Sequence, residues 1–133
     1  MIHGLNHLGI VVKDIDDMLG FLKEAFGAEE ISREEFPEMK QISSMVKIGE
    51  DLFELMEPTG VDGAAGKFLE EKGGGLHHVS LWCDDIVETC DKLEKQGLRL
   101  IGKVFEEPFM LAFIHPKSSK GILFEITEKP PNR

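Results

Sequence analysis

The sequence predicts an α+β fold built from two tandem β-α-β-β-β modules. Three short segments recur at a constant spacing of 71 residues, and the predicted elements follow the same order in each copy. The recurring pairs are Leu5–Ile10 with Leu76–Leu81, Asp14–Ile15 with Asp85–Ile86, and Leu52–Leu55 with Leu123–Ile126. We expect a single domain over residues 1–133, with module 1 at about 4–58, a connector at about 59–75 and module 2 at about 76–128.

The first module opens with a short apolar segment, Leu5–Val12, whose β-branched residues predict a strand. Asp14 is a suitable N-cap for the helix that follows, in which apolar residues continue at helical spacing as far as Phe26. Gly27 then suits the C-cap position. Further strands are expected near residues 28–33, 41–48 and 51–57, and a hairpin turn at Gly49–Asp51 joins the last two.

The second module repeats this order. His77–Cys83 is expected to be a strand, Asp85 caps a helix that ends at Gly97, and strands follow near residues 98–104, 109–115 and 122–127. The connector is expected to hold a short helix at residues 64–71 and a flexible run at Gly73–Gly75. The polar tail Lys129–Arg133 contains two prolines, and we expect it to be frayed.

Composition excludes several classes of function. A formal net charge of −10 argues against nucleic-acid binding. No apolar run approaches the roughly 20 residues that span a bilayer, and no basic segment precedes an apolar one at the N-terminus, so we expect neither a membrane partner nor a signal peptide. Cys83 and Cys90 have neither metal-finger nor disulfide-framework spacing. A cytoplasmic location is therefore the expectation.

The repeat places four potential metal ligands at equivalent positions. His7 and His78 lie on the first strand of each module, and Glu54 and Glu125 lie on the last, each Glu 47 residues after its His. Taken singly, each histidine is explained as a half-buried residue, and each glutamate as a residue on the solvent-exposed face of a strand. Taken together, imidazoles and carboxylates suit a borderline divalent ion such as Zn, Ni, Co or Mn. Since thiolates are missing from the set, an open site is favoured over a closed structural zinc site.

Five stretches carry a resemblance to a known family. They are Asn6–Val12, Arg33–Glu38, Glu54–Pro58, Gly73–Val79 and His115–Glu125. On these stretches the chain resembles the vicinal-oxygen-chelate (glyoxalase/bleomycin-resistance) superfamily over nearly its whole length, and within it the methylmalonyl-CoA epimerase family most of all. The last stretch, which begins His-Pro-Lys, is the most specific to the epimerases, whereas the leading His strand is common to the superfamily.

The resemblance implies that the paired modules form a cupped mixed sheet around one divalent metal ion, with His7, Glu54, His78 and Glu125 as ligands. Epimerases often carry Gln at the second of these positions, and the His-Glu-His-Glu set seen here is also typical of bacterial glyoxalase I. The strand at residues 40–47 contains no acid where some epimerases place a base, so the second base is unassigned. Residues 104–112 also lack the Gly-rich stretch that epimerases usually carry near the substrate.

The activity that this resemblance implies is interconversion of (2R)- and (2S)-methylmalonyl-CoA by proton abstraction at C2 through a metal-stabilised enolate. Glu125 is the candidate base, although it has to loosen from the metal or share it, and Glu54 is the second candidate from the opposite module. The candidates for holding the CoA phosphates are Lys117, Ser118, Ser119 and Lys120. The alternative for this loop is a solvated segment with unspecific lysines.

Other functions compete with this one. Glyoxalase I uses the same ligand set and proton abstraction on a glutathione hemithioacetal. A ring-cleaving Fe(II) dioxygenase needs two His and one carboxylate with open positions, whereas this chain fills a fourth. A metal-free binding protein of the same fold predicts loss of ligands, yet all four candidates are present. A homodimer is expected because modules of this fold expose sheet edges.

Overall fold

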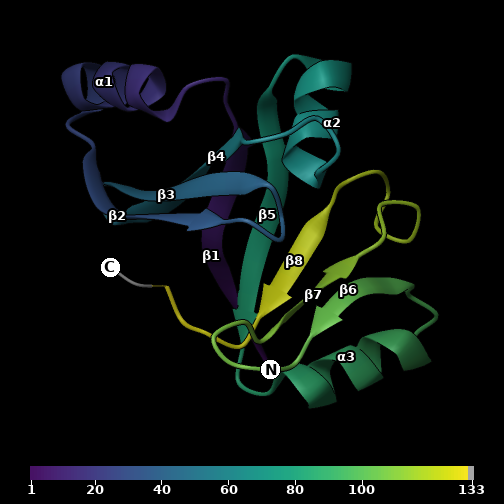
Figure 1. Cartoon of the computed structure of the whole chain (residues 1–133). Coiled ribbons are helices and arrows are strands. Elements are labelled where there is room, and N and C mark those ends of the chain that lie inside the picture. Colours follow the sequence, from purple (N-terminus) through teal and green to yellow (C-terminus); the bar gives the residue numbers. More distant parts are fainter. Residues whose placement is uncertain (132–133) are drawn as a thin grey trace. The chain divides into compact units, whose positions relative to one another are not determined.

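The computed structural model describes residues 1–131, which form two compact units. The first unit comprises residues 8–77, and the second comprises residues 1–7 together with 78–131. Strands β1 (Ile2–Val11) and β5 (Gly75–Cys83) each run from one unit into the other. The remaining elements of the first unit are α1 (Ile15–Phe26), β2 (Glu29–Phe36), β3 (Gln41–Ile48), β4 (Asp51–Pro58) and α2 (Ala64–Lys72). Those of the second are α3 (Ile86–Lys95), β6 (Leu100–Val104), β7 (Leu111–Ile114) and β8 (Phe124–Thr127) (Figure 1).

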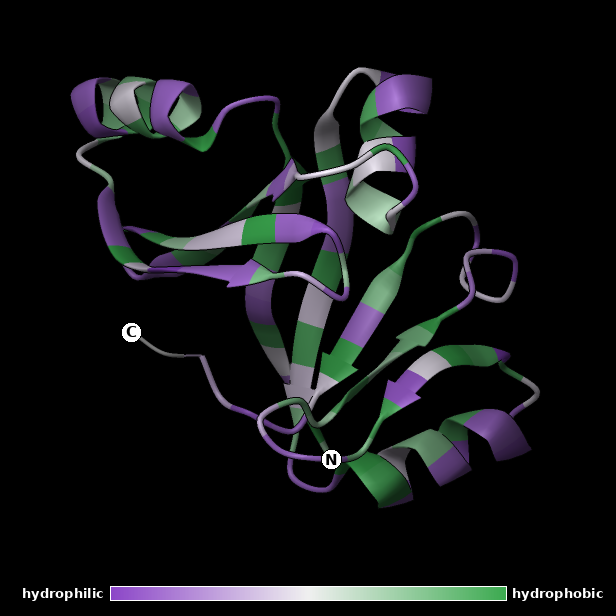
Figure 2. Cartoon of the chain, viewed as in Figure 1, coloured by the Kyte–Doolittle hydropathy of each residue, from purple (hydrophilic) through white to green (hydrophobic). Residues whose placement is uncertain are grey.

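In the first unit the strands follow the order β2-β3-β4-β1, with β1 parallel to β4 and the other pairs antiparallel. Helix α1 packs against one face, where Val46 and Leu55 belong to a buried apolar cluster. Met56 points to the opposite face because strand side chains alternate, and there it packs with Val11 against Ala65 of α2. Glu54 shares the face of Met56. Green and purple bands alternate along the strands in Figure 2, as this two-sided packing requires.

The second unit has the equivalent order β5-β8-β7-β6, again with one parallel pair, β5 with β8. Helix α3 covers the face that carries Ala112, Ile114 and Ile126, which form a buried cluster with the two cysteines. The opposite face carries Glu125 and Phe113, which stand directly across from each other on β8 and β7. Both units therefore mix parallel and antiparallel pairs, and the predicted α+β class with two β-α-β-β-β modules is confirmed.

The two modules also share their helix starts. Asp14 and Asp85 accept hydrogen bonds from the backbone N–H groups of Asp17 and Glu88, as N-caps do. In addition, Glu57 accepts the backbone N–H of Ile15 at 2.8 Å, and Glu128 accepts that of Ile86 at 2.9 Å. These contacts, like the ligand pairs, are separated by 71 residues, so the repeat extends to the hydrogen bonds that fix each helix on its sheet.

Strands β6, β7 and β8 are each shorter than expected. Strand β7 begins at Leu111 because Phe109 closes the turn that starts at Glu106. Each glycine of the run Gly73–Gly75 has a positive φ, of 79°, 99° and 113°, and a Cβ on Gly74 would lie 2.9 Å from the carbonyl oxygen of Val11. Glycine is needed there for both reasons. Lys129 in the tail is held by Glu107 and by the side chain of Asn6, whereas residues 132–133 lie outside the described residues.

Candidate metal centre

Three of the four predicted ligands belong to the second unit, where His7 lies close to each of the other two. His7 Nε2 lies 3.2 Å from His78 Nε2 and 3.7 Å from Glu125 Oε1. The three residues come from β1, β5 and β8, and each is at most 8% exposed. Two imidazole nitrogens this close repel each other unless a proton or a cation lies between them. A carboxylate oxygen lies beside His7, and imidazole and carboxylate are donor types that suit a borderline divalent cation.

Asn6 determines which nitrogen of His7 is available. The Asn6 side-chain amide donates from Nδ2 to the backbone carbonyl of Lys129 at 2.7 Å, which turns its Oδ1 towards His7. That oxygen lies 2.8 Å from His7 Nδ1, so Nδ1 carries the proton and donates it. Nε2 of the neutral ring is then left with its lone pair on the side of His78 and Glu125. This is the arrangement that supports a metal-binding histidine.

Ser80 holds the carboxylate of Glu125. Its hydroxyl donates to Glu125 Oε1 at 2.6 Å, and Ser80 is fully buried. The two residues are direct neighbours in the parallel pairing of β5 with β8, so the backbone register itself brings them together. The equivalent position in the first module is Gly9, which stands beside Glu54 and has no side chain to offer.

Glu54 belongs to the first unit and is supported differently. Its Oε2 accepts the hydroxyl of Ser43 at 2.8 Å, and Ser43 in turn accepts the side-chain amide of Gln41 at 2.9 Å. Both supporting residues lie on β3, the antiparallel neighbour of β4. The face of β3 that carries Gln41, Ser43 and Met45 contains no acid, in agreement with the expectation that the base found there in some epimerases is missing.

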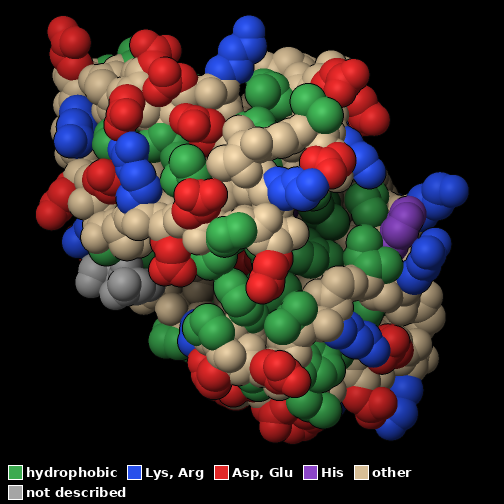
Figure 3. All heavy atoms as spheres, in the orientation of Figure 1, with side chains coloured by type: hydrophobic (Ala, Val, Ile, Leu, Met, Phe, Trp, Pro, Cys, Tyr) green, Lys and Arg blue, Asp and Glu red, His purple; other side chains and the backbone are tan. Residues whose placement is uncertain are grey.

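The loop after β7 is ordered by its own polar groups. Ser119 Oγ donates to the carbonyl of Ile122 at 2.5 Å, and Ser118 Oγ accepts the backbone N–H of Arg99 at 2.9 Å. Lys117 donates its backbone N–H to His115 Nδ1 at 3.0 Å, and the side chains of Lys117 and Lys120 are exposed. Acidic and basic side chains both occur over much of the surface drawn in Figure 3, on a chain with a net charge of −10.

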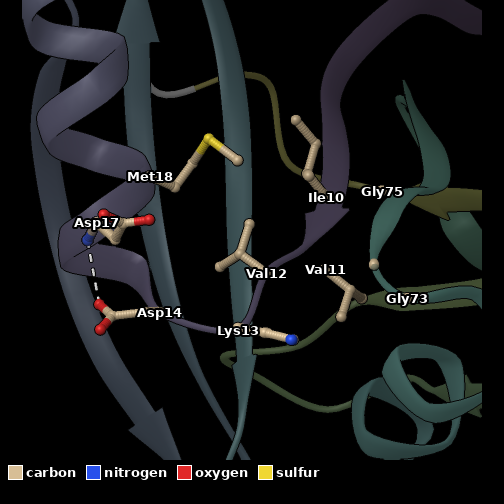
Figure 4. A pocket seen from close by; sticks show the side chains of 10 residues that line it. Ile10, Val11, Val12, Lys13, Asp14, Asp17, Met18, Gly73 and Gly75 are labelled. Carbon is tan, nitrogen blue, oxygen red and sulfur yellow. Dashed lines mark hydrogen bonds between the residues drawn. The ribbon is translucent and has the colours of Figure 1, made fainter.

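A shallow depression of about 200 Å³ lies in the first unit, away from the predicted site residues. It is bordered by Lys13, Met18 and the Gly73–Gly75 run, and Figure 4 shows the Asp14 carboxylate turned to the N–H of Asp17 beside it. Arg33, the first residue of the stretch Arg33–Glu38, donates hydrogen bonds to the carboxylates of Glu30 and Asp16, each at 2.7 Å. These two carboxylates raise the pKa of the Arg33 guanidinium further above its ordinary value.

Comparison with known proteins assigns the family. The sequence profile of the glyoxalase/bleomycin resistance protein/dioxygenase superfamily matches residues 6–112. The chain belongs to this superfamily. The match covers both helix-capping aspartates and three of the four predicted ligands, His7, Glu54 and His78.

Among curated proteins, an uncharacterized protein of Bacillus subtilis is 32% identical over 127 residues, which are 93% of this chain and 91% of that protein. The human mitochondrial methylmalonyl-CoA epimerase is 30% identical over 128 residues, which are 93% of this chain and 73% of the human protein. A probable lactoylglutathione lyase of Synechocystis is 31% identical over 108 residues, 78% of this chain and 75% of that protein.

A solved structure extends the similarity. The methylmalonyl-CoA epimerase of Streptomyces coelicolor, as a variant in complex with 2-nitronate-propionyl-CoA, superposes with a TM-score of 0.89 at 26% identity, covering 97% of this chain and 99% of that one. The superfamily and the resemblance to epimerases expected from the sequence are therefore confirmed. Among residues 1–131, no helix has the length and apolarity needed to cross a membrane.

Proposed function

We propose that this chain is a divalent-metal-dependent methylmalonyl-CoA epimerase. The observation that carries the proposal is the position of His7 Nε2, which lies 3.2 Å from His78 Nε2 and 3.7 Å from Glu125 Oε1 and is oriented by Asn6. Its support from outside the chain is similarity of about 30% identity to epimerases over nearly the whole length. We propose Glu54 as the fourth ligand, because it occupies in module 1 the position that Glu125 occupies in module 2.

A bound divalent ion, of which Co, Ni, Zn and Mn all suit these donors, would supply positive charge for the thioester and carboxylate oxygens that flank C2 of the substrate. The chain's own groups then decide where the proton goes. We propose that Glu125, as a carboxylate released from metal coordination, takes the C2 proton on one face of the acyl group. Glu54, released in the same way and protonated from water, gives its proton to C2 on the other face, and Glu125 then loses its proton to water. Ser80 and Ser43 orient the two carboxylates through the hydrogen bonds they donate.

The CoA portion is proposed to lie along the loop at residues 115–121. The exposed ammonium groups of Lys117 and Lys120 are available for phosphate oxygens. Ser118 and Ser119 are already engaged within the loop, so we propose that they contribute by holding its shape as well as by direct contact. Anions are otherwise disfavoured by the charge of −10, which makes this local arrangement of lysines necessary for an acyl-CoA partner.

The test is loss of optical activity. Single-epimer methylmalonyl-CoA is incubated with metal-free protein, with protein reconstituted with Co(II), Ni(II), Zn(II) or Mn(II), and with Glu125→Gln treated in the same way. We expect racemisation with at least one metal and a loss of at least roughly 100-fold in rate for Glu125→Gln. Glu71→Gln, on the exposed side of α2, is the matched control and should keep the wild-type rate. Racemisation that persists in Glu125→Gln contradicts the assigned base.

A second candidate is glyoxalase I activity. It is favoured by the carboxylate at Glu54 and by the 31% identity to the probable lactoylglutathione lyase of Synechocystis. The same reconstituted samples are tested with the glutathione–methylglyoxal hemithioacetal. Turnover of this substrate, with methylmalonyl-CoA left unchanged, would replace the proposed epimerase function by this one.

A further inference from the structure

An aromatic ring lies beside the proposed metal ligand His78 in the second unit. Phe113 contacts the ring of His78 edge-on, with the centroids 6.1 Å apart and the planes at 88°. It also stands directly opposite Glu125 in the antiparallel pairing of β7 with β8. Residues paired in this way place their side chains on the same face, with the Cβ atoms about 5 Å apart. The half-buried Phe113 ring therefore lies beside a proposed metal ligand and beside the proposed base.

The opposite side of the Phe113 ring is bounded by the backbone of β6. Gly102 lies at an irregularity of this strand, between Ile101 and Val104, and has a φ of 60°. A Cβ added to Gly102 would lie 3.3 Å from Phe113 Cδ2, closer than ordinary van der Waals contact. Gly102 thus leaves the ring just enough room on that side. A side chain larger than Phe at position 113 finds no additional room on the Gly102 side.

The equivalent place in the first module is occupied by a different kind of side chain. Met45 stands opposite Glu54 on β3, as Phe113 stands opposite Glu125 on β7. Methionine is flexible and adapts to neighbouring shapes, whereas a phenyl ring held between Gly102 and His78 has a fixed outline. Of these two apolar neighbours of the proposed bases, Phe113 is the one able to impose a size limit.

We propose that Phe113 sets the size of the alkyl branch that the site accepts at C2 of the malonyl thioester. This inference rests on the proposed function, since it places the reacting carbon beside Glu125. A methyl branch fits between the Phe113 ring edge and the carboxylate, and an additional methylene meets the ring. Phe113 is in this view a specificity residue that contacts the substrate's alkyl group and takes no part in proton transfer.

The test compares kcat/KM for 2-methylmalonyl-CoA and 2-ethylmalonyl-CoA in the reconstituted wild type and in Phe113→Ala, Phe113→Leu and Phe113→Trp. We expect the ethyl-to-methyl ratio to rise about tenfold or more with Ala, less with Leu, and to fall below the wild-type ratio with Trp, because one methylene in an apolar pocket changes discrimination by roughly 10–200-fold. Phe21→Ala is the control, since Phe21 is 56% exposed on α1 of the other unit. It should keep the wild-type ratio.

A second readout does not depend on turnover. In metal-free protein, Phe113→Ala and Phe113→Leu should change the NMR chemical shifts of the His78 ring protons, because both variants remove the edge-on ring contact. Phe21→Ala keeps this contact and should leave these chemical shifts unchanged. If Phe113→Ala does not fold, the Leu and Trp variants decide the question.

The outcomes separate the two proposals. Active wild type with a ratio that stays within twofold in every folded Phe113 variant overturns the role of Phe113 and leaves the epimerase function intact. Wild type that neither binds nor turns over either thioester overturns the proposed function, and this inference with it. A ratio that rises with Ala and falls with Trp, together with the shift of the His78 signals, supports both.

Discussion

Asn6 orients the His7 ring, with Nδ1 towards the Asn6 side-chain oxygen, and Asn6 is itself anchored by a distant carbonyl. The Asn6 side-chain amide donates a hydrogen bond to the carbonyl of Lys129, 123 residues away in the sequence. The Asn6 side-chain oxygen accepts a hydrogen bond from His7 Nδ1. The tail of the chain thereby orients a proposed ligand on the first strand. Supporting partners of metal-binding histidines commonly change metal affinity by roughly 10–100-fold when they are removed.

Asn6→Ala should therefore weaken Co(II) or Zn(II) binding by roughly 10–100-fold with little loss of fold. The affinity is measured by calorimetric titration of the metal-free protein. His77→Ala is the matched control, because His77 occupies the position equivalent to Asn6 in the second module and its ring contacts Phe68 instead. Equal affinities for wild type and Asn6→Ala would show that the Asn6 contact has no part in metal binding.

Ser80→Ala should destabilise the metal-free protein by about 1–3 kcal/mol, because it leaves a buried carboxylate oxygen of Glu125 without its donor. The free energy of unfolding is measured in urea. Ser43→Ala removes the analogous hydrogen bond to Glu54, which is less buried, so the cost there should be smaller. Equal and negligible losses in the two variants would contradict the assigned role of Ser80.

Lowering the pH should weaken the hydrogen bond between His3 and Asp84. His3 Nε2 lies 2.6 Å from Asp84 Oδ1, and this hydrogen bond, aided by the charge of His3, holds the pKa of Asp84 below its ordinary value. A carboxyl with a depressed folded-state pKa stabilises the fold above its unfolded pKa, about 4, and this contribution disappears as the pH falls through the folded pKa.

Asp84→Asn should accordingly lower Tm at pH 6, and the difference from wild type should begin to shrink near pH 4 and vanish once the pH lies below the depressed folded-state pKa of Asp84. Thermal unfolding is followed by circular dichroism between pH 2.5 and 7. Asp91→Asn is the control, since its pair with Lys95 is an exposed helix-surface contact, and such pairs contribute little. A Tm difference that grows towards acid pH would reverse the predicted sign.

The two cysteines should be inert in the folded protein. Burial raises the pKa of the Cys90 thiol to about 11 and also raises that of Cys83, and both side chains lie in the cluster under α3. Thiolate is the reactive form, so a disulfide reagent at pH 8 should label neither residue until the protein unfolds. Labelling in denaturant should be complete within the mixing time. Rapid labelling of native protein would show that the cluster opens readily.

Much of the fold could be predicted because the residues that begin and end its helices act locally. Asp14 and Gly27 bound α1 in the structure where the sequence placed the helix ends, since caps act within a few residues of themselves. The parallel pairings of β1 with β4 and of β5 with β8 could not be derived in this way. They join strands more than 40 residues apart, and only the packing of each intervening helix decides the order.

The ligands His7, His78 and Glu125 could be selected because a repeat makes equivalent residues visible without any structure. Their supporting residues could not. Ser80 has no polar counterpart at Gly9, and Asn6 depends on a carbonyl at the far end of the chain, so neither follows from periodicity. The contact of Phe113 with His78 likewise depends on strand register, and a one-residue slip would turn Phe113 to the face covered by α3.

The most direct test of the central claim is proton NMR of methylmalonyl-CoA in D2O with purified protein, with and without one equivalent of Co(II). We predict that the C2 proton signal disappears as deuterium enters, at a rate that requires the metal and that collapses in His78→Ala. No exchange at C2, in protein that binds one Co(II) per chain, would contradict the claim and leave a metal-binding member of the superfamily with another substrate.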